Sequence, residues 1–509
     1  MKADTIITNG KIHTMETLAP FAAALAIKDG RIAALGDDKD ILALAGLGTR
    51  VIDADGNTVL PGFIDAHVHF MGTGLDAAAA KLLGTQSRKD LFSRLHVQEQ
   101  NLKAGMWLRG FGYDETKFSE GALPSLAELD AAFPPRPVFL SRIDAHSCFL
   151  NSAACDLMAM DSDTEGIVTE AGAWTGVFRA AANSIARKKI AEELTTDEVR
   201  RTAMHMAARE ALSAGVTALH ALEGGSLYSD SDVNAMLKYA DELPIHTVLY
   251  HQIPDAKRVR AEGLPRVGGC ITVDGSLGSY TAALLEPYWD KPEICGTPYM
   301  TQRDIDDFVM EAHGLGMQIA MHTIGDRAIG MLMCAYEKAL ERYPRKDHRH
   351  RFEHFTLPTY DQIARAARLG VAISVQPSFD CLTHGMMALR LGPQRVRRGY
   401  PFRTIAEAGL VMAGGSDSNI TPIAPLFGIT ACLVHSQPEQ RLSLYEAIKL
   451  FTVNAAYIGF EEAERGSLAV GKCADITIIE GDIFNTPAED IQNMRVLKTL
   501  VGGTVHDWV

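Results

Sequence analysis

The sequence predicts a TIM (β/α)8 barrel that carries a small β-sandwich domain built from both ends of the chain. Between roughly residues 60 and 464, short apolar runs alternate with helical patterns such as 200–215 and 326–343, as a parallel-strand barrel requires. The eight apolar runs cover residues 59–69, 136–146, 215–223, 270–276, 317–326, 349–355, 371–378 and 410–418. A doubly wound open sheet is the alternative, but no G-x-G-x-x-G follows the first run.

Both chain ends show the alternation of polar and apolar residues that is typical of β-strands. An Asn-Gly pair at 9–10 and an Asp-Gly pair at 29–30 interrupt the front segment, and a Gly-Gly pair at 502–503 interrupts the back one. Such dipeptides favour tight hairpins. Neither end has enough apolar surface for a core of its own. We therefore expect 1–59 and 465–509 to form one discontinuous β-sandwich.

The barrel segment, 60–464, is interrupted near its start. The stretch between the first two apolar runs is longer than a normal strand-to-helix connection. We therefore expect an insertion over the barrel mouth, around residues 71–138.

Composition excludes several classes of protein. The chain has 47% hydrophobic and 22% charged residues, as ordinary globular proteins do. Its net charge of −14 argues against nucleic acid as a partner. No run reaches the roughly 18 apolar residues of a membrane span, and the first residues lack the apolar centre of a secretory signal. The 8 cysteines form no C-x-x-C pair, so we expect a reducing, cytoplasmic location. An exposed β-domain edge would suit a homo-oligomer.

Reactive side chains gather where the apolar runs end. The active site of a TIM barrel lies at the C-terminal ends of its strands. The corresponding positions of the eight runs hold His67 and His69, His146, His220, Cys270 or Asp274, His322, His354, Gln376 and Asp417. Six of the 17 histidines therefore fall where a scattered distribution would place few.

The His-x-His pair is the strongest indication of a metal site. His67 and His69 are one residue apart, so on a strand both imidazoles point to the same face. Imidazoles that converge with a carboxylate suit zinc. Two surface histidines are the alternative, but Asp65 before the pair and the residues at the other strand ends favour metal. We expect one or two zinc ions, with other divalent metals as alternatives.

Seven segments carry a resemblance to a known family. GFIDAHVHF (62–70) resembles the opening motif of the amidohydrolase superfamily of metal-dependent hydrolases. Six further segments resemble its amidohydrolase-3 branch, which includes N-substituted formamide deformylases. These segments are WLRGFGYDETKF (107–118), RIDAHSCFLNSAA (142–154), VDGSLGSYTAALL (273–285), HTIGDRAI (322–329), RFEHF (351–355) and GGSDSNI (414–420). The resemblance covers essentially the whole chain and implies a barrel with a flanking β-domain.

The resemblance implies roles for individual residues. Carried over to this chain, it makes His67, His69, His322 and His354 metal ligands. It makes Asp417 both a ligand and the proton shuttle. The physical argument agrees, because a carboxylate beside an activated water can accept its proton and pass it to a leaving amine. A helix N-cap is the alternative role for Asp417.

One position departs from the family pattern. Many superfamily members bridge two metals with a carboxylated lysine, which in this branch falls four residues before the Asp-Gly-Ser motif. This chain has Cys270 there. A thiolate can ligate or bridge zinc, as a resemblance to D-aminoacylases implies, or the site holds a single metal. A small buried thiol that fills the barrel is the remaining interpretation.

Two further histidines have less defined roles. Related sequences carry Asp-Gly-His at the second run and His-Asp at the third, where this chain has an alanine beside His146 and another beside His220. Either imidazole can hydrogen-bond a substrate carbonyl, and His146 is the better candidate for an electrophile near the metal. Packing is an equal alternative for both.

The resemblance and the motifs together predict an enzyme. We expect a hydrolase that uses metal-activated water to cleave a non-peptide C–N bond of amide type in a small molecule, with N-acyl or N-formyl compounds first. Deamination of a heterocycle on the same barrel is the second interpretation. A non-catalytic binding protein that has lost its metal is the third, and the intact ligand set argues against it.

Overall fold

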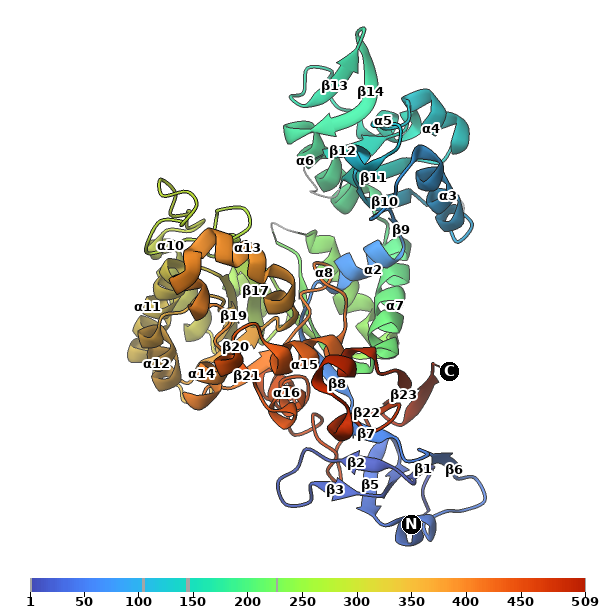
Figure 1. Ribbon diagram of the computed structural model, residues 1–509, viewed down its shortest axis with the longest axis vertical. Helices are drawn as coiled ribbons and strands as arrows, with labels where there is room; N and C mark the ends of the chain where they lie inside the picture. Colours follow the sequence, from blue (N-terminus) through green and yellow to red (C-terminus); the bar gives the residue numbers. More distant parts are fainter. Residues whose placement is uncertain (1, 103–105, 143–146, 226–227, 509) are drawn as a thin grey trace. The chain divides into compact units, whose positions relative to one another are not determined.

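A computed structural model describes residues 2–102, 106–142, 147–225 and 228–508 of the chain (Figure 1). These residues form two compact units, which we call the barrel unit and the inserted unit. The barrel unit comprises Met1–His69, Ala208–Ser226 and Ala240–Val509, and the inserted unit comprises Phe70–Ala207 and Leu227–Tyr239.

An eight-stranded parallel sheet forms the centre of the barrel unit, in the order β21-β20-β19-β18-β17-β16-β15-β8. Its strands are β8 (Phe63–Val68), β15 (Val216–Glu223), β16 (His246–His251), β17 (Arg266–Thr272), β18 (Gln318–Thr323), β19 (Arg351–His354), β20 (Ala372–Val375) and β21 (Met412–Gly414). The two edge strands meet just beyond their ends, where Val68 and Ser418 form a parallel bridge. There the His69 N–H donates to the Ser418 carbonyl at 2.6 Å, and the Asp417 N–H donates to the His67 carbonyl at 2.8 Å. The predicted TIM-like barrel is confirmed.

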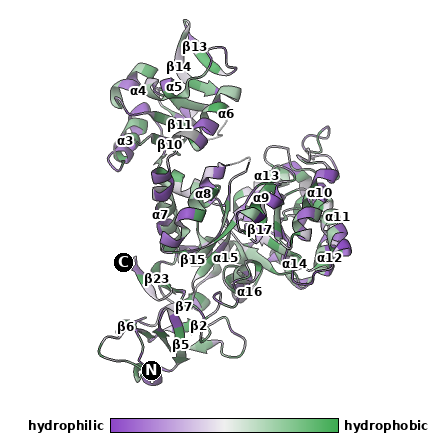
Figure 2. Ribbon diagram, turned by 180° about the vertical axis from the view of Figure 1, so that it is seen from behind, coloured by the Kyte–Doolittle hydropathy of each residue, from purple (hydrophilic) through white to green (hydrophobic). Residues whose placement is uncertain are grey.

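Helices cover the outside of the barrel sheet, whose strands are buried on both faces. They are α9 (Ala256–Ala261), α10 (Gln302–Gly314), α11 (Asp326–Arg342), α12 (Tyr360–Leu369), α13 (Ser378–Arg395), α14 (Phe402–Glu407), α15 (Pro425–Val434), α16 (Leu444–Leu450) and α17 (Val453–Ile458). Capping boxes at Thr301, Thr359 and Ser443 begin three of them, which satisfies their first free N–H groups. Hydrophilic residues, purple in Figure 2, lie along α11 and α12. Within the described residues, we find no helix with the length and apolar character needed to cross a bilayer.

The two chain ends form one β-sandwich, as predicted. One sheet has the order β5-β4-β1-β6 and the other β24-β23-β22-β7-β2-β3. Their strands are β1 (Thr5–Thr8), β2 (Lys11–His13), β3 (Phe21–Ala22), β4 (Ala24–Lys28), β5 (Arg31–Gly36), β6 (Arg50–Asp53), β7 (Thr58–Pro61), β22 (Ile476–Ile479), β23 (Val496–Val501) and β24 (Thr504–Asp507). A single apolar cluster joins them, because Ile7 and Leu25 of one sheet and Ile478 and Leu500 of the other belong to it.

Two of the three predicted turns are hairpins and the third is not. Asp29-Gly30 joins the antiparallel strands β4 and β5, and Gly502-Gly503 joins β23 and β24. All four residues have positive φ, as a tight hairpin of this length requires. Asn9, also at positive φ, instead leads the chain from β1 in one sheet to β2 in the other. Each dipeptide therefore predicts a tight turn, but it does not predict whether the strands on either side of the turn pair with each other.

The inserted unit is built around its own six-stranded sheet, in the order β13-β14-β12-β11-β10-β9. Its strands are β9 (Ala80–Lys81), β10 (Leu108–Tyr113), β11 (Val138–Arg142), β12 (Ser147–Leu150), β13 (Ile167–Glu170) and β14 (Ala173–Arg179). Helices α2 (Phe70–Ala77), α3 (Arg88–Glu99), α4 (Leu126–Ala132), α5 (Ser152–Met158), α6 (Ala180–Lys189) and α8 (Asp230–Tyr239) belong to the same unit, and α7 (Asp197–Ser213) crosses its boundary. Leu108, Phe133 and Leu140 lie in its buried core.

The assignment of run 136–146 to the barrel is wrong. That run contains β11, which pairs with β10 and β12 of the inserted unit. The barrel strand that the sequence pattern missed is β16, which runs from His246 to His251 between β15 and β17. An apolar run such as that of β11 indicates burial without indicating the sheet in which the strand is buried. In β16, HTVLYH, a short apolar centre lies between polar ends, so no clear apolar run marks it.

Three buried histidines near the N-terminal ends of the barrel strands form a closed hydrogen-bond chain. His350 Nδ1 accepts from the Ile319 N–H, so its Nε2–H donates to His313 Nδ1 at 2.9 Å. His313 Nε2 then donates to the Tyr343 carbonyl. His348 Nδ1 accepts from the His350 N–H, and its Nε2 donates to the Leu369 carbonyl. Every ring nitrogen has a partner, and the three Nδ1 atoms accept hydrogen bonds, which only a neutral imidazole can do.

Acid should therefore destabilise this end of the barrel. Burial lowers the pKa of His313, His348 and His350 below the usual value of 6.5. As the pH falls below 6.5, the three histidines take up protons in the unfolded chain before they do so in the folded protein. The free energy of unfolding, complete above pH 6.5, should therefore fall by about 1.4 kcal/mol per pH unit for each histidine. Thermal unfolding at pH 7.5 and 5.5 measures this loss. A His348→Asn variant keeps a short polar side chain without a titrating group, so its melting temperature should fall less. An equal fall in both proteins would contradict the assignment.

Candidate metal centre

Six potential metal donors converge at the C-terminal ends of five barrel strands. They are His67 and His69 at the end of β8, Cys270 on β17, His322 on β18, His354 on β19 and Asp417 after β21. Three groups among them have all their donor atoms within 4.8 Å of one another. Five of the side chains are at least nine-tenths buried, and His322 is 13% exposed. The structure brings together every residue that the sequence predicted as a ligand.

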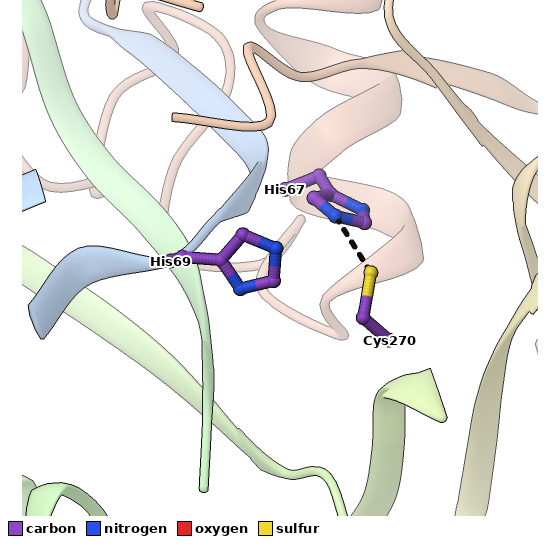
Figure 3. Close-up of side chains that lie close together, drawn as sticks. All are labelled: His67, His69 and Cys270. Carbon is purple, nitrogen blue, oxygen red and sulfur yellow. Dashed lines mark hydrogen bonds between the residues drawn. The ribbon is translucent and has the colours of Figure 1, made fainter. Parts of the chain in front are cut away.

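The thiol of Cys270 lies at the centre of this cluster. Its Sγ is 3.3 Å from His67 Nε2, 3.8 Å from His354 Nε2 and 4.0 Å from His322 Nδ1. Figure 3 shows His67 and His69 approaching from one strand and Cys270 from another, with the rings facing the sulfur. Cys270 belongs to one donor group with His67 and His69 and to another with His322 and His354. Cys270 would therefore be a ligand in either donor group if a metal were bound there.

Two glycines before Cys270 put its side chain there. Gly268 and Gly269 have φ values of +101° and +110° and interrupt the register between β17 and β18. A Cβ at Gly268 would lie 1.9 Å from the Ala320 carbonyl oxygen, and one at Gly269 would lie 2.7 Å from Leu222. Only glycine therefore fits this bulge, which sets the direction in which Cys270 leaves the strand.

Asp417 closes the other side of the cluster. Its Oδ1 lies 3.1 Å from His69 Nε2 and 3.3 Å from His67 Nε2. The backbone of Asp417 has φ +58°, a left-handed conformation that costs a non-glycine residue about 1–3 kcal/mol. Asp65 fixes the strands beneath it by accepting the N–H groups of Ser416 and His67.

A second left-handed residue explains how β19 presents its donor. Arg351 and Glu353 share the interior face of the strand, so the next residue, His354, would point outward in a regular strand. His354 has φ +68°, which turns the chain at that point. Its Nε2 thereby reaches the Cys270 sulfur, while its Nδ1 hydrogen-bonds Gln376 Oε1 at 2.6 Å.

In His67, His69 and His322, the ring nitrogen that faces away from the donor cluster also contacts a neighbouring oxygen. His67 Nδ1 hydrogen-bonds the Glu353 carboxylate at 2.6 Å, and His69 Nδ1 contacts the Leu222 carbonyl at 3.2 Å. His322 is reversed, since its Nε2 contacts the Gly275 carbonyl at 3.2 Å and its Nδ1 faces the sulfur. Such outer contacts fix the tautomer and orientation of a histidine ligand.

Electrostatics favour the anionic forms of the two acidic donors. Burial would raise the pKa of Asp417, but His67 and His69 lower it below its usual value. Burial would likewise raise the pKa of Cys270, but the charge of His67 and contacts with His322 lower it well below its usual 9.0. A thiolate and a carboxylate among four imidazoles form a buried set of nitrogen, sulfur and oxygen donors. This set fits a borderline-soft divalent cation.

The structure describes two of the other predicted residues, His220 and Asp274, outside the donor groups. His146 falls outside the described residues. His220 lies within β15, where its Nδ1 accepts from Arg351 at 2.8 Å, which favours the packing interpretation. Asp274 accepts the N–H groups of three residues, Ala283, Ile324 and Gly325, so it is a structural anchor of the neighbouring loops.

Sequence reasoning missed two residues next to the donors. Glu353 contacts His67, and Arg351 pairs with Glu353 inside the barrel. The sequence contains a signal for this pair, because two charged residues at alternate positions of a buried strand are uncommon unless the two groups share a partner.

Comparison with known proteins identifies the family. A sequence model described as the amidohydrolase family matches residues 50–506. The chain belongs to this family. Protein LONG AFTER FAR-RED 3 of Arabidopsis thaliana is 31% identical over 98% of this chain and 91% of its own length. An N-substituted formamide deformylase of Arthrobacter pascens is 24% identical over 99% of this chain and 98% of its own length.

A solved structure supports the same assignment within the amidohydrolase family. An uncharacterized metal-dependent hydrolase from Pyrococcus furiosus is 28% identical to this chain, with a TM-score of 0.81. The match covers 94% of this chain and 99% of the other. The resemblance seen in the sequence motifs is confirmed, and this amidohydrolase is assigned to metal-dependent hydrolysis in general.

Proposed function

We propose that this amidohydrolase cleaves a non-peptide C–N bond of amide type in a small molecule, with N-formyl and N-acyl compounds as the substrate class. The observation that carries the proposal is the buried cluster of His67, His69, Cys270, His322, His354 and Asp417. The likeness to an N-substituted formamide deformylase, which spans 99% of this chain, supports the choice of bond.

Zinc is the metal that we propose for the site, as one or two ions. Imidazole and thiolate donors suit zinc better than magnesium or calcium, which prefer oxygen. Four imidazoles, one thiolate and one carboxylate exceed the three protein ligands that a single catalytic zinc ordinarily has. The shared position of Cys270 therefore favours two ions. When bound, such an ion supplies Lewis-acid chemistry that activates water and polarises a carbonyl.

Asp417 has the main chemical role among the residues of this chain. Its carboxylate, kept ionised beside His67 and His69, accepts the proton of the attacking water. It then delivers that proton to the nitrogen of the tetrahedral intermediate, because an amine leaves readily only when protonated. His146 is proposed, on its motif alone, to hydrogen-bond the substrate carbonyl oxygen.

A compound panel tests the proposed bond class. Zinc-loaded protein should release formate or another carboxylate from N-formyl and N-acyl amines, and a chelator-treated sample should release none. Ammonia release from heterocycles, without carboxylate release, would establish the deaminase alternative instead. A purified protein that holds no zinc and turns over no compound would support the non-catalytic interpretation.

Replacement of Cys270 by serine should change the metal content. The hydroxyl of serine is a weaker zinc donor than a thiolate, so Cys270→Ser should bind less zinc or bind it with altered stoichiometry. Elemental analysis of the purified protein measures this. Cys432→Ser is a matched control, since Cys432 is fully buried in α15 outside the donor groups. Unchanged zinc content and turnover in Cys270→Ser would return this residue to core packing.

A further inference from the structure

One of the four histidine donors differs from the others in its outer partner. His69 and His322 contact backbone carbonyls, and His354 contacts the neutral amide of Gln376. His67 Nδ1 instead hydrogen-bonds a carboxylate, that of Glu353, at 2.6 Å, whereas the carboxylate near His322, that of Asp274, lies 3.9 Å from its Nε2. Neither His67 nor Glu353 has any solvent exposure. The contact is therefore a buried, charge-assisted hydrogen bond.

The carboxylate of Glu353 is in turn held by Arg351. The guanidinium donates through Nε to Oε1 at 2.7 Å and through a terminal nitrogen to Oε2 at 2.9 Å. The side chains of both residues are 0% exposed. This bidentate geometry fixes the plane of the carboxylate and neutralises its charge.

The remaining N–H groups of Arg351 are also used. They donate to His220 Nδ1 at 2.8 Å, to the Tyr250 hydroxyl at 2.9 Å and to the Ala66 carbonyl at 2.7 Å. All five guanidinium donors thus have acceptors. A side chain held in this way leaves Glu353 with one position relative to His67.

We infer that Arg351 and Glu353 are positioning residues for the metal centre, an inference that rests on the proposed function. Because Glu353 holds Nδ1, the ring of His67 turns its Nε2 toward Cys270 and Asp417. A carboxylate partner strengthens an imidazole as a donor, and Arg351 limits that effect by sharing the same charge. The pair therefore sets the orientation and the donor strength of His67.

A role in stability alone does not account for this arrangement. Apolar residues of similar volume often stabilise a protein as well as a buried ion pair does. A barrel interior that needed only packing would not require five aligned donors beneath one metal ligand. A positioning role predicts that loss of the pair weakens metal binding. A role in stability alone predicts that metal affinity changes only as the melting temperature does.

Three variants separate the two interpretations. Glu353→Gln keeps the size of the side chain and removes its charge. Arg351→Met removes the cation and leaves the carboxylate. The double variant removes both charges and avoids an unpaired buried ion. Competition with a chromogenic chelator measures zinc affinity, and the near-ultraviolet band of the cobalt-substituted protein reports the thiolate bond. Ile373→Ala is the control, a substitution of a buried β20 residue that should lower stability and removes neither member of the pair.

Zinc affinity should fall about 10–100-fold in Glu353→Gln and in the double variant, because outer partners of histidine ligands have effects of this size. Arg351→Met should melt at a lower temperature yet bind zinc at least as tightly as the unmodified chain. If Arg351→Met does not fold, the other two variants still decide the question. Affinities that only follow the melting temperature, as in Ile373→Ala, would overturn the inference.

This result is separate from the proposed bond class. A zinc-loaded chain that hydrolyses no amide, with the affinity changes present, would remove the function and leave the positioning role. Hydrolysis with unchanged affinity in Glu353→Gln would do the reverse.

Discussion

Metal-loaded Asp417→Asn should lose on the order of 10²–10⁴-fold in kcat, with a much smaller change in KM. Asparagine has the shape of aspartate and tolerates the left-handed backbone at this position, where φ is +58°. It cannot accept the proton of water or return it to the leaving nitrogen. The loss should therefore fall on the chemical step, and steady-state kinetics on an N-formyl or N-acyl substrate measures it.

The comparison is informative only at equal metal content, because Asp417 is also a proposed ligand. Zinc content is therefore measured on the same samples. A useful companion is Asp274→Asn, which removes a buried carboxylate 3.9 Å from His322 that holds backbone N–H groups. It should lower stability far more than kcat. Metal-loaded Asp417→Asn that works within a few-fold of the unmodified enzyme would exclude Asp417 as the shuttle and move the role to His146.

His67→Ala and His322→Ala should each lose metal and, with it, turnover on the order of 10³-fold or more. Each removes one nitrogen donor from a different group around Cys270. A site with two ions should lose about one ion in each variant, whereas a single-ion site should lose its metal in both. Elemental analysis and turnover on the same preparation distinguish these outcomes.

His313→Ala serves as the histidine control for both variants. His313 is buried at the opposite end of the barrel strands, with His350 and the Tyr343 carbonyl as its partners. Its loss should lower thermal stability and leave zinc content unchanged. Full metal content and turnover in both His67→Ala and His322→Ala would refute the proposed centre.

Local sequence signals predicted most of the fold. The strands near His67, His322 and Asp417 end in residues that have no packing role in an apolar strand, so the sequence marks both the strand and its functional end. The same logic misplaced 136–146, because β11 is as apolar as a barrel strand. It missed β16, whose ends at His246 and His251 carry no motif. Strand pairing depends on distant partners that a local pattern does not contain.

The donors could be predicted and their supports could not. Five of the six proposed ligands lie in a family motif near a strand end, and Cys270 stands four residues before the Asp-Gly-Ser motif. Glu353 and Arg351 act through His67, which is 286 residues from Glu353 in sequence. The turn at His354 also escapes prediction, because a regular strand would point this residue away from Cys270. Contacts between distant strands created both features.

The discontinuous β-sandwich has a consequence for synthesis on the ribosome. β7 pairs with β22, so the strand that ends at Pro61 waits for a partner that begins at Ile476. At the usual elongation rate of 5–20 residues per second this delay lasts roughly 20–80 s. The sheet of β1, β4, β5 and β6 can form early, but the sheet that covers its apolar inner face lacks β22, β23 and β24 until the last residues emerge. The nascent chain therefore leaves part of that face exposed throughout translation of the barrel, and we expect chaperones that bind it in this interval to increase the yield of folded protein.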